Sequence, residues 1–207
     1  MTATVTADLA ITLDGYVAGP NVSGDNPGGD GAERIFDWIH TLASWRERQG
    51  MTGGDENRDS ELVREWFDAT GAVVMGRTMY DLGEEFWGDN PPFRTPVFVL
   101  THRPRPTLVK EGGTTFHFVT EGIHSALERA RAAAGDRNVD IGGGADTVRQ
   151  YLAAGLVDEL QLHVVPVLLG GGLRLFEGLG DAGRRDLEQL GAVETPLATH
   201  LKYRFVK

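Results

Sequence analysis

Val139-Asp140-Ile141-Gly142-Gly143-Gly144-Ala145-Asp146-Thr147 takes the chain from a short apolar run, through three glycines, into a stretch typical of a helix. The pattern predicts a buried strand that turns directly into a helix. Glycine backbone at a helix N-terminus lets amide N–H groups approach an anion closely, and the helix dipole favours negative charge there. The spacing matches neither G-x-G-x-x-G nor a Walker loop. Two interpretations therefore stay open for these residues alone, a pyrophosphate site and a tight structural turn.

A second strand end has the same form. Val73-Val74-Met75 leads into Gly76, Arg77 and Thr78, where a helix is expected to begin. Arg77 offers a guanidinium fork to a phosphate, and Thr78 offers a hydroxyl. Taken alone, the same residues also fit a solvated arginine followed by a helix-capping threonine.

A third strand end carries the densest basic cluster that follows a predicted strand in this acidic chain. Val97-Phe98-Val99-Leu100 leads into Thr101, His102, Arg103 and Arg105. These donors suit the 2′-phosphate of an adenosine ribose, although a basic surface loop would look the same.

The three strand ends gain weight when they are taken together. In open α/β sheets, ligands bind beyond the carboxyl ends of the strands, and the ends of parallel strands lie on one rim. Three adjacent ends with phosphate-compatible groups therefore predict a phosphorylated nucleotide, NADPH, as the cofactor.

The remaining apolar segments predict a single α/β domain over residues 1–207. Strands are expected near 5–13, 72–75, 96–101, 115–119, 139–141, 159–165, 186–193 and 200–206, with 16–18 extending the first strand past a bend. Helices are expected near 33–48, 60–70, 78–82, 123–134 and 145–154, and Asp59 or Ser60 is expected to cap the second of them. Alternating strands and helices imply parallel, right-handed crossovers, whereas the last two strands follow each other directly and predict an antiparallel pair.

Composition excludes several classes of protein. The 207 residues carry a net charge of −10, which argues against a duplex-DNA binder, and the absence of cysteine removes disulfides and thiolate metal sites. The histidines show no HxxH-type spacing, so we expect no metal site. No apolar run approaches ~18 residues, and no basic region precedes an apolar one at the N-terminus, so we expect a cytoplasmic protein without a membrane span.

The ordered set of motifs resembles the dihydrofolate reductase superfamily. It is closer to the C-terminal reductase domain of the bifunctional riboflavin-biosynthesis deaminase-reductase and to that domain's stand-alone relatives. The resemblance covers about residues 4–205 and rests on segments that occur in the family's order, namely Leu13–Gly19, Met75–Thr78, Leu100–Arg103, Ile141–Gly144, Val157–Leu160 and Pro166–Gly172 with Leu175-Phe176.

The resemblance implies a three-layer fold, with helices on both faces of a mixed, mostly parallel, eight-stranded sheet. It also implies NADPH binding, with Gly76, Arg77 and Thr78 near the phosphates, Thr101, His102 and Arg103 by the 2′-phosphate, and Gly142, Gly143, Gly144 and Ala145 by the pyrophosphate. Asp14 would lie in the substrate pocket as the candidate catalytic residue, although an Asp before Gly15 is also a common turn former. The resemblance further implies a homodimer.

The implied activity is NADPH-dependent reduction of a small heterocycle, as by 5-amino-6-(5-phosphoribosylamino)uracil reductase or dihydrofolate reductase. The alternative is a non-catalytic nucleotide-binding or stress-related protein that retains the fold.

Several side chains are candidates for contact with a substrate. Dihydrofolate reductases carry a substrate-binding carboxylate on the helix before the Met75-Gly76-Arg77 strand, and the candidates here are Asp59, Glu61, Glu65 and Asp68. We expect Glu61 and Glu65 to be solvated. Phe36, Trp38, Trp45 and Trp87 could stack on a flat substrate or belong to the core, and His163 is expected to be packed or to face a dimer partner.

Overall fold

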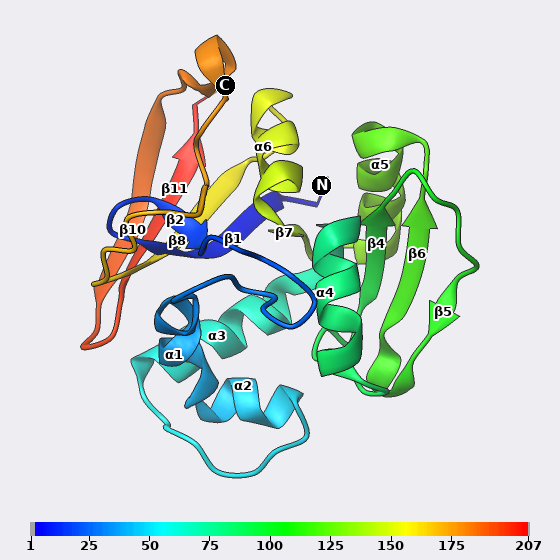
Figure 1. Cartoon of the computed structure of the whole chain (residues 1–207). Helices are drawn as coiled ribbons and strands as arrows, with labels where there is room; N and C mark the ends of the chain where they lie inside the picture. The colour runs from blue at the N-terminus through cyan, green and yellow to red at the C-terminus, as the bar shows by residue number, and fades with distance from the viewer. Residues whose placement is uncertain (1–2, 207) are drawn as a thin grey trace.

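A nine-stranded sheet forms the centre of the computed structural model, which describes residues 3–206 (Figure 1). The strands lie in the order β10-β11-β8-β1-β7-β3-β4-β6-β5. Their bounds are β1 Val5–Thr12, β3 Thr70–Gly76, β4 Pro96–Leu100, β5 Leu108–Val109, β6 Thr115–Val119, β7 Asn138–Gly143, β8 Glu159–Val165, β10 Leu187–Glu194 and β11 Thr199–Phe205.

The sheet is mixed and mostly parallel, as the sequence predicts. Neighbouring strands from β8 through β1, β7, β3 and β4 to β6 are parallel, β11 is antiparallel to both β8 and β10, and β5 is antiparallel to β6. All eight predicted strands are present, and the ninth is the two-residue edge strand β5, which is too short to leave a periodic signal. The segment Tyr16–Ala18 does not extend β1, because it forms β2 and pairs with β9 (Leu173–Arg174) in a separate small sheet.

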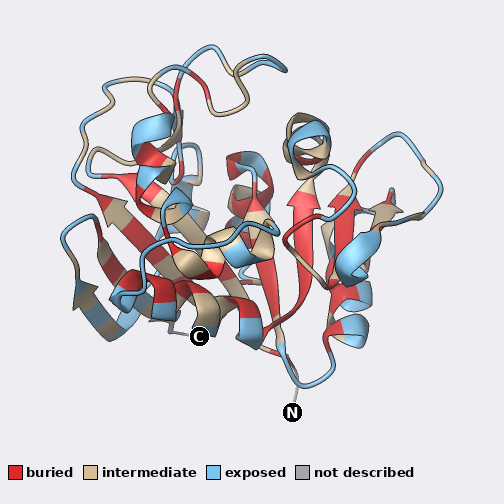
Figure 2. Cartoon of the chain, turned by 90° about the horizontal axis from the view of Figure 1, so that it is seen from below, coloured by how far each residue is buried: buried red, intermediate tan, exposed pale blue. Residues whose placement is uncertain are grey.

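Helices cover both faces and produce three layers. One face packs against α5 (Gly122–Ala134) and α6 (Ala145–Ala153), in a core that includes Val148 and Tyr151. The other face lies under α1 (Glu33–His40), α2 (Ala43–Arg48), α3 (Arg58–Ala69) and α4 (Arg77–Trp87), in two smaller apolar clusters. Short 3-10 turns occur at Glu111–Gly113 and Gly180–Gly183. Buried residues gather in the strands and on the inner sides of the helices (Figure 2).

Three helix predictions need correction. The helix expected over 33–48 is two helices, because Leu42 is fully buried in extended backbone (φ −70°, ψ 137°) and breaks the helical path. Asn57 caps α3, since its side chain accepts the backbone N–H of Ser60, so neither Asp59 nor Ser60 is the cap. Helix α4 continues to Trp87, beyond the predicted end at Leu82.

Strand β1 shows how the sheet positions the site. Val5, Ala7 and Ile11 join the core beneath α5 and α6. Residues of a strand alternate between faces, so Asp8 and Ala10 lie on the opposite face, beneath α1 and α3. This places a carboxylate in the middle of the sheet, on the side where the molecule is hollowed.

Candidate active site

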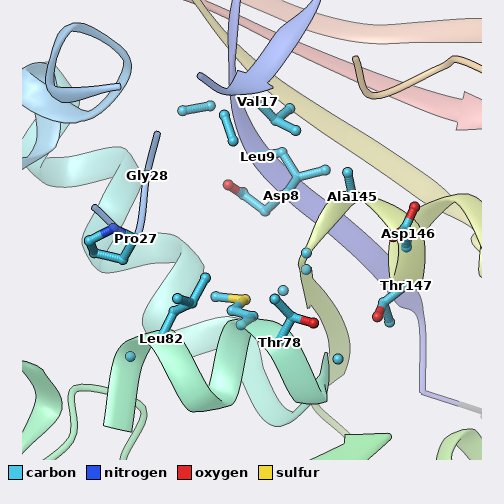
Figure 3. Close-up of a pocket in the computed structure, with 18 of the residues that line it drawn as sticks. Asp8, Leu9, Val17, Pro27, Gly28, Thr78, Leu82, Ala145, Asp146 and Thr147 are labelled. Carbon is cyan, nitrogen blue, oxygen red and sulfur yellow. The ribbon is translucent and has the colours of Figure 1, made fainter. Parts of the chain in front are cut away.

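A cleft of about 1090 Å³ opens on the α1–α4 side of the sheet. One part of its wall comes from the ends of β3, β4, β6 and β7 with the first turns of α4 and α6, and another from β1, α1, α2 and α3. Figure 3 shows Thr78 and Leu82 of α4 facing Asp8 across the cavity, with Ala145, Asp146 and Thr147 of α6 alongside. The cleft has the size of a site for a cofactor or a drug-sized ligand.

The three strand ends singled out in the sequence meet at one end of this cleft. Strands β7, β3 and β4 are parallel neighbours, so their carboxyl ends lie side by side. All ten predicted cofactor-binding residues line the cleft, namely Gly76, Arg77, Thr78, Thr101, His102, Arg103, Gly142, Gly143, Gly144 and Ala145. Their role toward a cofactor stays a prediction, but the structure brings them together.

Two helix N-termini open into this end of the cleft. Helix α4 begins after Gly76 and helix α6 after Gly144, and neither has a side-chain cap. The N–H groups of an uncapped first turn and the helix dipole together favour an anion. A Cβ at Gly76 would collide with Thr147 Oγ1, so glycine is required there by packing, whereas a Cβ at Gly144 would meet nothing within 4 Å. The backbone at Gly144 therefore faces open space.

The cations of the cleft are held by one carboxylate. Asp81 accepts from Arg77 Nε at 2.6 Å and from Arg103 at 3.4 Å, and it thereby keeps both guanidinium groups near the ends of β3 and β4. Thr101 Oγ1 accepts the backbone N–H of Arg103 at 3.0 Å, so this hydroxyl shapes the turn that presents His102 and Arg103. Arg105 lies elsewhere, because it forms a two-pronged pair with Glu84 at 2.8 and 3.0 Å and does not line the cleft.

Asp14 is not among the residues that line the cleft. Its carboxylate accepts the hydroxyl of Thr12 at 2.6 Å and the backbone N–H groups of Leu169 and Gly170 at 3.1 and 2.8 Å. These hydrogen bonds, that of Thr12 first, lower the pKa of Asp14 to about 2. Asp14 thus links residues 169–170 to the end of β1 through hydrogen bonds. A catalytic role for Asp14 stays an untested prediction.

The other half of the cleft is aromatic. Phe36, Trp38, Trp45 and Trp87, the residues expected either to stack on a substrate or to lie in the core, all line it, and Trp66 joins them. Trp38 is 4% exposed and belongs to the core beneath α1 and α3, which confirms the core expectation for it, and its stacking on a substrate stays a prediction. In the described part of the chain, no lysine or arginine contributes to this half.

A chain of four polar side chains runs from the cleft into the core. Asp8 Oδ1 lies 2.6 Å from His163 Nε2, His163 Nδ1 lies 2.6 Å from His200 Nδ1, and His200 Nε2 lies 2.6 Å from Asp59 Oδ1. Asp8 and His163 line the cleft, whereas His200 and Asp59 are buried at 3% and 2% exposure. Burial, followed by the neighbouring His163, lowers the pKa of His200.

A further carboxyl, that of Asp140, lies beside this chain. It is fully buried on β7, contacts the hydroxyl of Thr6 at 3.2 Å, and leaves Oδ2 without a hydrogen-bond partner. Burial, and then the negative charge of Asp8, raise the pKa of Asp140 well above its usual range. Burial therefore favours the protonated form of Asp140, and Asp8 is the carboxyl of this pair that lines the cleft.

Metal chemistry finds no support in the described residues, among which no group of three or more histidines and carboxylates is placed to hold an ion. Within residues 3–206, no helix has the length and apolar character needed to cross a membrane.

The model of the RibD C-terminal domain matches residues 3–199 of the chain. The chain belongs to this family. A Bacillus subtilis (strain 168) member of unassigned activity, YwjB, is 25% identical over 177 residues, which cover 83% of this chain and 81% of YwjB. The family identifies the chain as a reductase-type domain, as the motif order predicts.

Solved structures confirm the fold of this RibD C-terminal domain. A protein from Shewanella sp. PV-4 assigned to riboflavin biosynthesis superimposes with a TM-score of 0.67 at 23% identity, over 100% of both chains. Dihydrofolate reductase from Enterococcus faecalis, in a complex with NADP(H), superimposes with a TM-score of 0.57 at 14% identity, again over 100% of both chains. The dihydrofolate reductase-like architecture is thus shared along the whole chain.

For this RibD C-terminal domain, sequence reasoning missed the buried polar chain. The sequence predicts Asp59 as a helix cap or a pocket carboxylate and His163 as a packed or dimer-facing residue, whereas Asp8 and His200 carry no signal of their own. Glu61 and Glu65 are exposed and pair with Arg58, as expected. A polar residue in the middle of each of two apolar strands was the available clue, because buried polar groups need partners.

Proposed function

We propose that this protein is an NADPH-dependent reductase of a small heterocycle, similar to 5-amino-6-(5-phosphoribosylamino)uracil reductase or dihydrofolate reductase. The observation that carries the proposal is the convergence of two uncapped helix N-termini and two arginines at one end of a single cleft. The structurally similar Enterococcus faecalis enzyme, which is bound to NADP(H), adds support.

The residues present fit a dinucleotide. Gly142, Gly143, Gly144 and Ala145 would hold the pyrophosphate through backbone N–H groups, since the open space at Gly144 lets a ligand approach the main chain. Gly76, Arg77 and Thr78 would contact the phosphates from α4. His102 and Arg103 would meet the 2′-phosphate on the turn that Thr101 shapes. When bound, the cofactor supplies the hydride, and the protein contributes position and exclusion of water.

The aromatic half of the cleft indicates the substrate class. A flat heterocycle gains apolar contact and stacking against such side chains. The cations Arg77 and Arg103 lie at the opposite, phosphate-binding end, so within residues 3–206 the substrate end offers no lysine or arginine to a phosphate. We therefore propose a heterocycle whose bound part carries no phosphate, which separates this protein from a reductase that depends on a phosphoribosyl group.

Binding and turnover test the proposal separately. NADPH should bind with a dissociation constant well below that of NADH, as measured by nicotinamide fluorescence. Oxidation of NADPH, followed at 340 nm, should then accelerate with a member of a panel comprising 7,8-dihydrobiopterin, 5-amino-6-(ribosylamino)uracil, its 5′-phosphate and a quinonoid dye. Tight NADPH binding without turnover of any compound would favour the non-catalytic alternative. Turnover of the 5′-phosphate alone would refute the substrate class.

A further inference from the structure

We propose that Asp8 and His163 form the proton-exchanging group of the cleft, and that His200 and Asp59 act as positioning residues that hold its proton. The inference rests on the proposed reductase function for its chemistry. It extends that function to the group that protonates the substrate, at residues other than Asp14.

The contacts of the polar chain demand shared protons. Three contacts of 2.6 Å link two carboxyls and two imidazoles, and each contact needs one hydrogen. With both carboxylates ionised, three hydrogens on the four ring nitrogens make one ring an imidazolium and the other neutral. Moving these hydrogens along the contacts gives a form with a protonated Asp8 and two neutral rings. The first form has two carboxylates and one imidazolium, the second has one carboxylate and no charged ring, and both carry a net charge of −1. A proton can therefore reach Asp8 without another proton entering the core.

The surroundings favour the proton at the cleft end of the chain. Burial and the neighbouring ring lower the pKa of His200, which disfavours a positive charge on the His200 ring. The ring of Trp38 lies 4.6 Å from that of His163, within the range in which an aromatic face stabilises a cation. Asp59, at the far end on α3, is 2% exposed, and its Oδ1 contacts His200.

Every element packed around the chain supports a single exchangeable proton. Strand β7 contributes Asp140, whose pKa is raised by burial, and β1 contributes Thr6, whose hydroxyl contacts the Asp140 carboxyl. Strands β8 and β11 contribute His163 and His200 as directly opposed residues, and α1 contributes the uncharged Trp38. Among these groups, Asp8 and His163 are the titratable side chains that line the cleft.

The step balances as a reduction of a substrate C=N bond. The carbon receives the hydride with its electron pair from NADPH, which becomes NADP⁺. The nitrogen receives a proton as an O–H bond at Asp8, or an N–H bond at His163, breaks. The polar chain is then left with one proton fewer, and a proton from water restores it through the cleft after the product leaves.

Histidine-selective ¹⁵N NMR of the free protein between pH 5 and 9 tests the shared proton without cofactor or substrate. Asp59→Asn keeps an oxygen that accepts from His200 but removes a negative charge, so it should lower the titration midpoint of His163, a ring that it does not touch. Glu61→Gln changes an exposed carboxylate on the same helix and should leave that midpoint unchanged. An identical His163 titration in Asp59→Asn and wild type would overturn the proposal.

Single-turnover hydride transfer supplies the second readout, with NADPH and the panel compound that is reduced fastest. Asp8→Asn should slow the step by about 100-fold or more, as loss of a general acid does, while the dissociation constant of NADPH stays within twofold. Asp59→Asn should shift the pH profile of the step, and Glu61→Gln should not. An unchanged rate in Asp8→Asn would overturn the role of Asp8. Absence of NADPH binding would refute the proposed function instead, and the NMR result would then decide the shared proton alone.

Discussion

Replacing Gly144 by alanine separates cofactor binding from folding. Gly144 has φ −65° and ψ −175°, a conformation open to alanine, and its Cβ would meet no atom within 4 Å beyond its chain neighbours. A Gly→Ala change at such a position alters stability by about 1 kcal/mol or less, mostly through the unfolded chain. The free energy of unfolding should therefore stay close to that of wild type.

The effect on NADPH should be far larger. The new methyl group would occupy the space from which a pyrophosphate approaches the first turn of α6, so at least one charge-assisted hydrogen bond is lost. Such a bond contributes about 1.5–3 kcal/mol. That loss corresponds to an increase of about 10- to 150-fold in the dissociation constant.

Titration of NADPH by nicotinamide fluorescence, alongside urea unfolding followed by circular dichroism, measures both quantities. Gly171→Ala is the matched control, because Gly171 also has space for a Cβ but does not line the cleft. Unchanged NADPH affinity in a folded Gly144→Ala protein would refute the assignment of this turn to the pyrophosphate.

Three further predictions concern other parts of the molecule. Arg103→Ala should weaken NADPH binding by about 10-fold and leave NADH binding nearly unchanged, since a single phosphate contact is lost, and equal losses in the two titrations would remove Arg103 from the 2′-phosphate. Asp14→Asn should reduce the loss of stability that the wild-type protein shows below pH 4. The lowered pKa of Asp14 means that its ionised form stabilises the fold above the ordinary pKa of 3.8, and this contribution disappears as the pH falls toward about 2. Thermal melts over this range should converge for the two proteins, and parallel curves would contradict this stabilising role. Phe67→Ala should cost about 3–5 kcal/mol in urea unfolding, because its ring is 6% exposed and packs on Trp66 with centroids 4.5 Å apart, and a cost below about 1 kcal/mol would contradict this packing.

Much of the fold follows from local sequence signals. Apolar runs such as Val73-Val74-Met75 are long enough to identify buried strands, and glycine-led turns mark where each ends. Because β7, β3 and β4 are parallel neighbours, the three phosphate-compatible strand ends could be predicted to meet, and they do. The break at Leu42 could not be predicted, since the helical periodicity continues through it and only tertiary burial selects the extended backbone.

The polar chain lay beyond sequence reasoning for a related reason. His163 and His200 meet because β8 and β11 pair in one particular register, and Asp59 reaches them from a helix about 140 positions away from His200. No local pattern encodes such a register. For Asp14, a familiar motif predicts a substrate contact, which stays untested, and the structure adds three protein donors to its carboxylate that the motif does not indicate. The homodimer stays a prediction, which sedimentation equilibrium would measure.

A crystal structure of the protein with NADPH tests the central claim most directly. The account predicts pyrophosphate oxygens within hydrogen-bond distance of the backbone N–H groups of residues 143–145, the 2′-phosphate beside Arg103, and the nicotinamide ring in the part of the cleft that Asp8 and His163 line. A cofactor bound outside this cleft, or one whose nicotinamide points away from Asp8, would contradict it.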